Sequence, residues 1–166
     1  MRAKRILAVA VLLVIAFLIV FPPLMNAGVK MVLSSSSAVA AEHLYATVGK
    51  ISAHRSDTSD PSGWFSVTNT STEVDLTAVN VTVTVALGSL PLGEYDTVRL
   101  TVINATAIIN STSKKVHLET AVFTIPVSFL VQFGVQAAIM LKVAPELQEG
   151  ADTVNLRLSF TAASVG

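Results

Sequence analysis

The sequence has no cysteine and little charge. Because cysteine is absent, disulfides, thiolate nucleophiles and cysteine-bound metals are excluded, and the fold must be held by its core and its backbone hydrogen bonds. Charged residues make up 13% of the 166 residues, and 11 Lys and Arg residues balance 11 Asp and Glu residues. A chain without a basic excess lacks the electrostatic footprint of nucleic-acid binding, so we expect no nucleic-acid partner.

Motifs of catalysis and of metal binding are also missing from the sequence. The three histidines, His43, His54 and His117, lie far apart and belong to no nucleophile elbow, phosphate-binding glycine loop or paired-histidine motif. The acidic residues between positions 57 and 75 do not have the spacing of a calcium-binding loop. We therefore predict a non-enzymatic protein with no catalytic residues, no metal site and no cofactor.

Long apolar runs are present at the N-terminus. A short positive stub ends at Arg5, and residues 6–21 follow without one polar side chain. A positive flank before an apolar run predicts an N-terminal apolar helix over residues 1–27, with the rest of the chain carried across the membrane. We expect the protein to be anchored on the extracellular face of the cell membrane or to be secreted.

Two fates of this segment stay open. The small-x-small triplet that ends at Ala40 is typical of a signal peptide cleaved before Ala41. The length of the run favours a retained transmembrane anchor instead, because about 20 apolar residues span a bilayer. In the retained form the membrane itself is a partner.

Residues 28–42 contain a run of four serines, from Ser34 to Ser37, among small residues. Serine side chains compete for backbone hydrogen bonds and disfavour a continuing helix. The composition predicts a flexible, serine-rich tether over residues 28–42. The remaining residues, 43–166, are then the extracellular domain.

Apolar and polar residues alternate through most of residues 43–166. Val81, Val83, Val85 and Leu87 alternate with mostly polar neighbours, a period of two that is typical of a half-buried strand. Glycine and proline in residues 88–93 are expected to break this strand.

Irregular positions are visible inside other alternating runs. The apolar positions change from even to odd residue numbers at Gly49 and again at Ile103. The change predicts a β-bulge at Gly49 and either a bulge or a strand switch at Ile103. Pro126 interrupts an apolar run and has no N–H to donate to a neighbouring strand, so we expect it on an edge strand or between two short strands. Short strands separated by turn residues, without a helical pattern, predict an all-β fold: a single antiparallel β-sandwich of immunoglobulin or transthyretin type, preceded by the N-terminal apolar helix.

A short motif links the chain to a known family. Leu90, Pro91, Gly93 and Tyr95 form a Leu-Pro-x-Gly-x-Tyr turn, and Arg99 lies in the strand that follows. This passage resembles the secreted prokaryotic domain-of-unknown-function family 4382, and the resemblance covers roughly residues 45–160. It implies a transthyretin-like or immunoglobulin-like sandwich on the cell surface that is often described as carbohydrate-binding-like, and it transfers no catalytic residues.

Glycosylation motifs are the most informative local feature. Four of the six asparagines begin an Asn-x-Ser/Thr triplet, which is more than the serine and threonine content predicts by chance. In a strand, residues two apart share a face, so the asparagine and the hydroxyl residue of a triplet point the same way. The predicted glycosylation sites are Asn69, Asn80, Asn104 and Asn110.

Two aromatic residues are candidates for ligand contact. For Trp64 the favoured interpretation is core packing of its indole, and stacking on a sugar ring is the alternative. For Tyr95 the favoured interpretation is a buried ring whose hydroxyl finds a local hydrogen-bond partner.

Three functions are compatible with these observations. The leading hypothesis is a non-enzymatic extracellular cell-surface protein with a structural or binding role in the envelope. The first alternative is a filament subunit in which a strand within residues 41–53 is donated to a neighbouring copy of the chain. The second is a carbohydrate-binding module that holds polysaccharide through Trp64.

Overall fold

The computed structural model describes residues 26–149 and 153–165. Most of the apolar segment predicted as an N-terminal helix, residues 1–25, lies outside the described residues. All regular structure in the described part is β-strand. None of the described residues forms a helix with the length and apolar character needed to span a bilayer.

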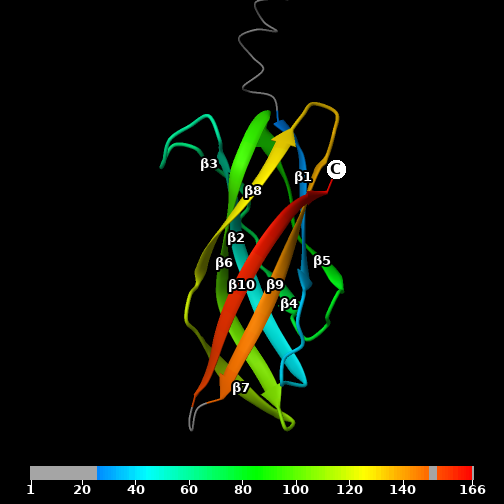
Figure 1. The fold of residues 1–166 in the computed structure, drawn as a ribbon, viewed down its shortest axis with the longest axis vertical. Coiled ribbons are helices and arrows are strands. Elements are labelled where there is room, and N and C mark those ends of the chain that lie inside the picture. Colours follow the sequence, from blue (N-terminus) through cyan, green and yellow to red (C-terminus); the bar gives the residue numbers. More distant parts are fainter. Residues whose placement is uncertain (1–25, 150–152, 166) are drawn as a thin grey trace, which may run out of the picture.

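The described residues form ten strands, which run steeply along the long axis of the molecule (Figure 1). They are β1 (Asn26–Ser35), β2 (His43–Arg55), β3 (Trp64–Thr68), β4 (Thr72–Asp75), β5 (Thr82–Pro91), β6 (Gly93–Ile109), β7 (Thr112–Leu118), β8 (Val122–Val131), β9 (Ala137–Glu149) and β10 (Val154–Val165). The strand content confirms the all-β prediction.

The strands form one mixed sheet rather than the predicted single antiparallel sandwich, so that prediction is wrong. The order along the sheet is β3-β2-β6-β7-β10-β9-β1-β5, with β4 added beside β2 and β8 beside β6. Most pairs are antiparallel, but β1 runs parallel to β9 and β7 runs parallel to β10. Because β7 pairs with β6 through its first half and with β10 through its second half, it joins the two halves of the sheet.

The predicted tether is the largest local error. Residues 26–35 form strand β1, which pairs with β5 on one side and with β9 on the other. Its alternate side chains Ala27, Val29, Met31 and Leu33 are buried in the core. The serine run begins only at Ser34, at the end of this strand. The prediction of a tether relied on that serine content and overlooked the alternating pattern of residues 27–33 before it.

The two predicted bulges are confirmed, and they face each other. Val48 pairs with Val102 and Thr47 pairs with Asn104, which leaves Ile103 without a partner in β2. A second register shift follows Val48, at Gly49. A Cβ at Gly49 would lie 2.7 Å from the Cδ1 atom of Ile103, so only glycine leaves room for that side chain.

Strand β5 differs from its predicted pattern. A register shift against β1 interrupts the alternation, so Val85 and Ala86 are both buried and Leu87 is exposed. Val81 is also exposed and precedes the first residue of the strand. The strand also continues through Gly88 instead of ending there.

Gly88 marks the place where the curved sheet nearly closes on itself. A Cβ at this position would lie 2.1 Å from the carbonyl oxygen of Val67 in β3. Strands β3 and β5 are the two ends of the strand order, so the absence of a side chain at Gly88 allows these ends to approach.

Two further predictions are confirmed. Strand β8, which carries Pro126, pairs only with β6 among the described strands and is therefore an edge. The ring of Tyr95 is 1% exposed, and its hydroxyl donates a 2.9 Å hydrogen bond to the carbonyl oxygen of Pro91. The ring stacks on Phe129 at 5.2 Å between centroids, and burial raises the Tyr95 pKa to about 12.

Candidate functional site

A shallow groove lies on the outer face of strands β3, β2 and β6. Antiparallel pairing aligns Ser66, Ser52 and Arg99 in one row across these strands, and Trp64 pairs with His54 in the next row. The residues of this Trp64 groove enclose about 290 Å³ and are Lys50, Ser52, Pro61, Trp64, Ser66, Arg99 and Thr101. The groove therefore combines one indole, two cations and three hydroxyls.

Trp64 is half-buried in the wall of the groove and is not part of the buried core, so the prediction that its indole packs in the core is wrong. The guanidinium carbon of Arg99 lies 3.7 Å from the centroid of the Trp64 ring, a cation–π contact. The indole Nε1 donates a hydrogen bond to Oδ1 of Asp60. Arg99 thus covers part of the ring that was the candidate surface for sugar stacking, and the indole fixes the position of the guanidinium.

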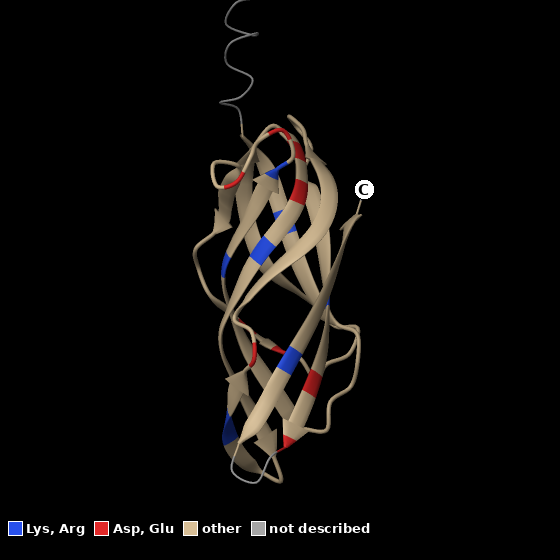
Figure 2. Ribbon diagram, turned by 60° about the vertical axis from the view of Figure 1, so that its left-hand side comes forward, with Lys and Arg blue, Asp and Glu red and all other residues tan. Residues whose placement is uncertain are grey.

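The cations of the groove lack a carboxylate partner within the described part of the chain. Among the residues that the structure describes, no Asp or Glu oxygen lies within 4.0 Å of the charged groups of Lys50 or Arg99. Figure 2 shows how few positions on the strands carry charge at all. A half-buried guanidinium held flat on an indole, with hydroxyls beside it, is arranged to receive a carboxylate or sulfate group.

His54 of β2 lies between Asp96 of β6 and the loop that ends at Trp64. Nδ1 of His54 lies 3.0 Å from Oδ1 of Asp96, and its Nε2 lies 3.8 Å from Oδ1 of Asp60. Burial tends to raise the pKa of Asp96, but hydrogen bonds from His54 and Thr97 outweigh it and lower that pKa. The hydrogen bond between His54 and Asp96 joins β2 to β6, whereas Nε2 of His54 makes no hydrogen bond within the described residues.

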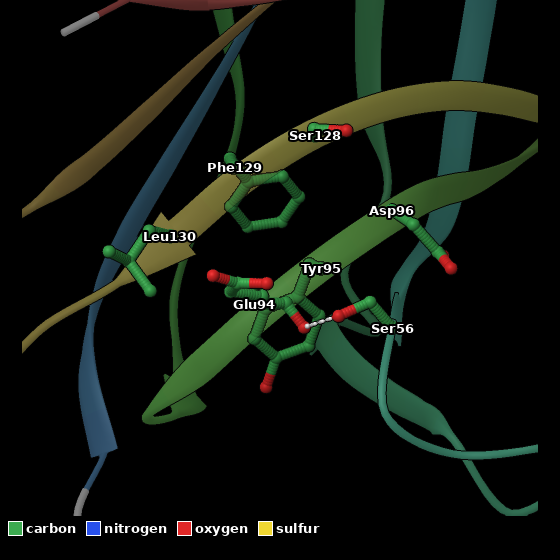
Figure 3. Close-up of a pocket in the computed structure, with 7 residues that line it drawn as sticks. All are labelled: Ser56, Glu94, Tyr95, Asp96, Ser128, Phe129 and Leu130. Carbon is green, nitrogen blue, oxygen red and sulfur yellow. Dashed lines mark hydrogen bonds between the residues drawn. The ribbon is translucent and has the colours of Figure 1, made fainter.

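A second pocket, of about 340 Å³, has the opposite charge (Figure 3). It is lined by Ser56, Glu94, Tyr95, Asp96, Ser128, Phe129 and Leu130. Ser56 donates its hydroxyl to the backbone carbonyl of Glu94 over 3.1 Å, so that hydroxyl serves the loop. Among the described residues, no group of three or more His, Asp or Glu side chains is placed to hold a metal ion.

All four predicted glycosylation asparagines lie at the surface. Asn69, Asn80, Asn104 and Asn110 are exposed. Asn110 and Ser111 have φ values of 49° and 58° and form the tight turn between β6 and β7, where left-handed backbone suits a two-residue hairpin loop. The oxygen Oδ1 of Asn69 accepts a hydrogen bond from Ser66, a groove residue, over 3.0 Å.

The other predicted positions lie between or within strands. Ala40 and Ala41 lie in the connection between β1 and β2, so the proposed cleavage bond falls after a strand of the sheet. The segment proposed for donation, residues 41–53, is mostly β2, which pairs with β6 on one edge and with β3 and β4 on the other.

Sequence reasoning identified Trp64 but missed its cationic neighbours. Arg99 was considered only as part of the family motif, and Lys50 was not considered. The sequence did contain a signal, because alternate residues of a strand share one face of the sheet. Ser52 and His54 share the polar face of one strand, and Arg99 and Thr101 share the polar face of another.

Comparison with known proteins gives a family but no characterised relative. A family model described as "Domain of unknown function (DUF4382)" matches residues 26–159. No curated protein and no solved structure matches the chain.

Proposed function

The chain belongs to the DUF4382 family of domains of unknown function, and from this premise we propose that it is an exported, non-enzymatic binding module for an acidic polysaccharide of the cell envelope. The observation that carries the proposal is the Trp64 groove, in which Arg99 is held on the indole without a carboxylate partner among the described residues.

The chemistry of the groove favours an acidic ligand over a neutral one. A guanidinium binds carboxylate or sulfate oxygens through paired hydrogen bonds, and Lys50 adds a second positive charge at the same hollow. Ser52, Ser66 and Thr101 provide hydroxyls that exchange hydrogen bonds with sugar hydroxyls. Because Arg99 occupies the indole face, we propose binding through charge and hydroxyls instead of ring stacking.

The location of the protein is a separate part of the proposal. The apolar run at residues 6–21 after a positive stub supports export, with the domain either anchored or released. Four exposed Asn-x-Ser/Thr triplets support a surface that can carry glycans in a host that attaches them.

Affinity electrophoresis of the full chain in gels that contain polygalacturonate, dextran sulfate or neutral dextran tests the ligand class. We expect retardation by the two acidic polymers, and we expect added salt to weaken it because the cations are near solvent. Arg99→Gln should lower the affinity about 10- to 100-fold, since a charge-assisted hydrogen bond contributes on the order of 1.5–3 kcal/mol.

The matched control is Arg157→Gln, which removes the same charge from an exposed position of β10 outside the groove. Equal losses for the two variants would reduce the effect to net charge and refute the groove. Retardation by neutral dextran as strong as that by polygalacturonate would refute the acidic ligand.

A further inference from the structure

The turn between β8 and β9 presents apolar side chains to solvent. Residues 132–136 read Gln-Phe-Gly-Val-Gln and carry no charge. Phe133 is 75% exposed and Val135 is 57% exposed, and Leu130 at the end of β8 is 46% exposed. The backbone N–H of Val135 donates to the carbonyl oxygen of Gln132 over 3.4 Å, so this is a formed turn with its apolar side chains directed outward.

This β8–β9 turn lies at the end of the molecule where the chain enters the sheet. Val29 of β1 pairs with Ala137, the residue that follows the turn. A Cβ at Gly28 would contact the side chain of Gln136 at 3.6 Å. In Figure 1 the turn and the start of β1 lie at the same end of the long axis, and β7 lies at the other end.

The chain that precedes β1 is itself apolar. Residues 6–21 contain no polar side chain and join β1 through only a few residues. If that run is retained in a bilayer, the end of the domain with the β8–β9 turn is held within a few residues of the lipid surface. Phenylalanine and valine on an uncharged turn are then placed where apolar side chains leave water for the membrane interface.

We propose that the β8–β9 turn is a membrane contact, in which Phe133 and Val135 insert into the bilayer surface and orient the domain on its anchor. The contact is hydrophobic, because the turn has no cation and Glu94 pairs opposite Leu130 at its base. Zwitterionic lipid is therefore a sufficient surface. The proposal rests on the anchored form of the proposed function and does not depend on the Trp64 groove.

Site-directed spin labelling of the full chain tests the contact. Since the sequence has no cysteine, Phe133→Cys and Val135→Cys each introduce one attachment point at an exposed side chain. The control is Ser113→Cys, an exposed position of β7 at the opposite end of the molecule. Each protein is reconstituted into phosphatidylcholine vesicles, and collisions of the label with oxygen, which concentrates in lipid, are compared with collisions with a water-soluble nickel chelate.

Labels at positions 133 and 135 should collide several-fold more with oxygen than with the nickel chelate, and the label at position 113 should show the reverse. Nickel accessibility at 133 and 135 equal to that at 113, or failure of the full chain to enter the vesicles, would overturn the inference. Affinity electrophoresis of the same labelled proteins separates the two ideas, because a water-exposed label with intact polysaccharide binding contradicts only the membrane contact.

Discussion

Replacing Tyr95 with phenylalanine removes one hydroxyl from the core and leaves the ring in place. In the native protein that hydroxyl donates to the carbonyl oxygen of Pro91 over 2.9 Å, while the ring stacks on Phe129. At neutral pH, loss of a buried hydrogen bond with its acceptor left unpaired costs about 1–3 kcal/mol of unfolding free energy. We expect Tyr95→Phe to be less stable by an amount in that range in urea denaturation.

The same hydroxyl gives the wild type a specific sensitivity to alkali. Burial raises the Tyr95 pKa to about 12 from an ordinary value of 10.0. A folded pKa above the unfolded one means that the stability is fully present below pH 10 and is lost as the pH rises toward 12. At about 1.36 kcal/mol per pH unit, the wild type should lose about 2 kcal/mol through this group by pH 11.5.

Denaturation of both proteins at intervals from pH 8 to pH 11.5 isolates this contribution, because all other titrating groups are common to them. The stability advantage of the wild type should be constant to about pH 10 and should then shrink, by about 2 kcal/mol at pH 11.5. A difference that stays constant over the whole range would refute the assignment of Tyr95 as a buried, neutral hydrogen-bond donor.

Two further predictions concern the closure of the sheet and an acid-sensitive contact. Gly88→Ala should lower the free energy of unfolding, measured in urea, by at least about 1–3 kcal/mol, because the new Cβ would lie 2.1 Å from the Val67 carbonyl oxygen. The control, Ser89→Ala on the next residue, should be close to neutral. Equal stability of the two variants would show that β3 and β5 do not approach as described. For Asp75, burial acts to raise the pKa, but hydrogen bonds from Thr77, from His43 and from backbone N–H groups outweigh it and lower the pKa below 3.8. The stability that Asp75 contributes is therefore present above about pH 4 and is lost as the pH falls further. The melting temperature should fall less steeply between pH 5 and pH 2.5 in Asp75→Asn than in the wild type. Parallel melting curves for the two proteins over this pH range would contradict the prediction.

Local features of the fold were readable from the sequence where one strand determines them. A change of apolar parity at Gly49 or Ile103 is a property of a single strand, and the structure has a bulge at each. The position of Pro126 on an edge follows likewise from one missing N–H donor.

Pairing between distant strands was not readable in the same way. The alternation of a strand does not state the direction of its neighbour, so the parallel pairs of β1 with β9 and of β7 with β10 had no signal in the sequence. The composition of the groove could not be predicted for the same reason. Arg99 contacts Trp64 only because of the register in which β3, β2 and β6 pair. The sequence alone could identify Trp64 as a candidate site residue, but it could not identify Arg99 as the cation that contacts it.

The position of β1 has a consequence for proteolytic maturation. Cleavage between Ala40 and Ala41 would separate from the domain a strand that pairs on both edges and contributes four buried apolar side chains. The remainder would expose the unpaired edges of β5 and β9, which would template the addition of an extended segment from another molecule. Processing at that bond would therefore determine whether the protein exists as self-sufficient monomers or depends on a neighbour to complete its sheet.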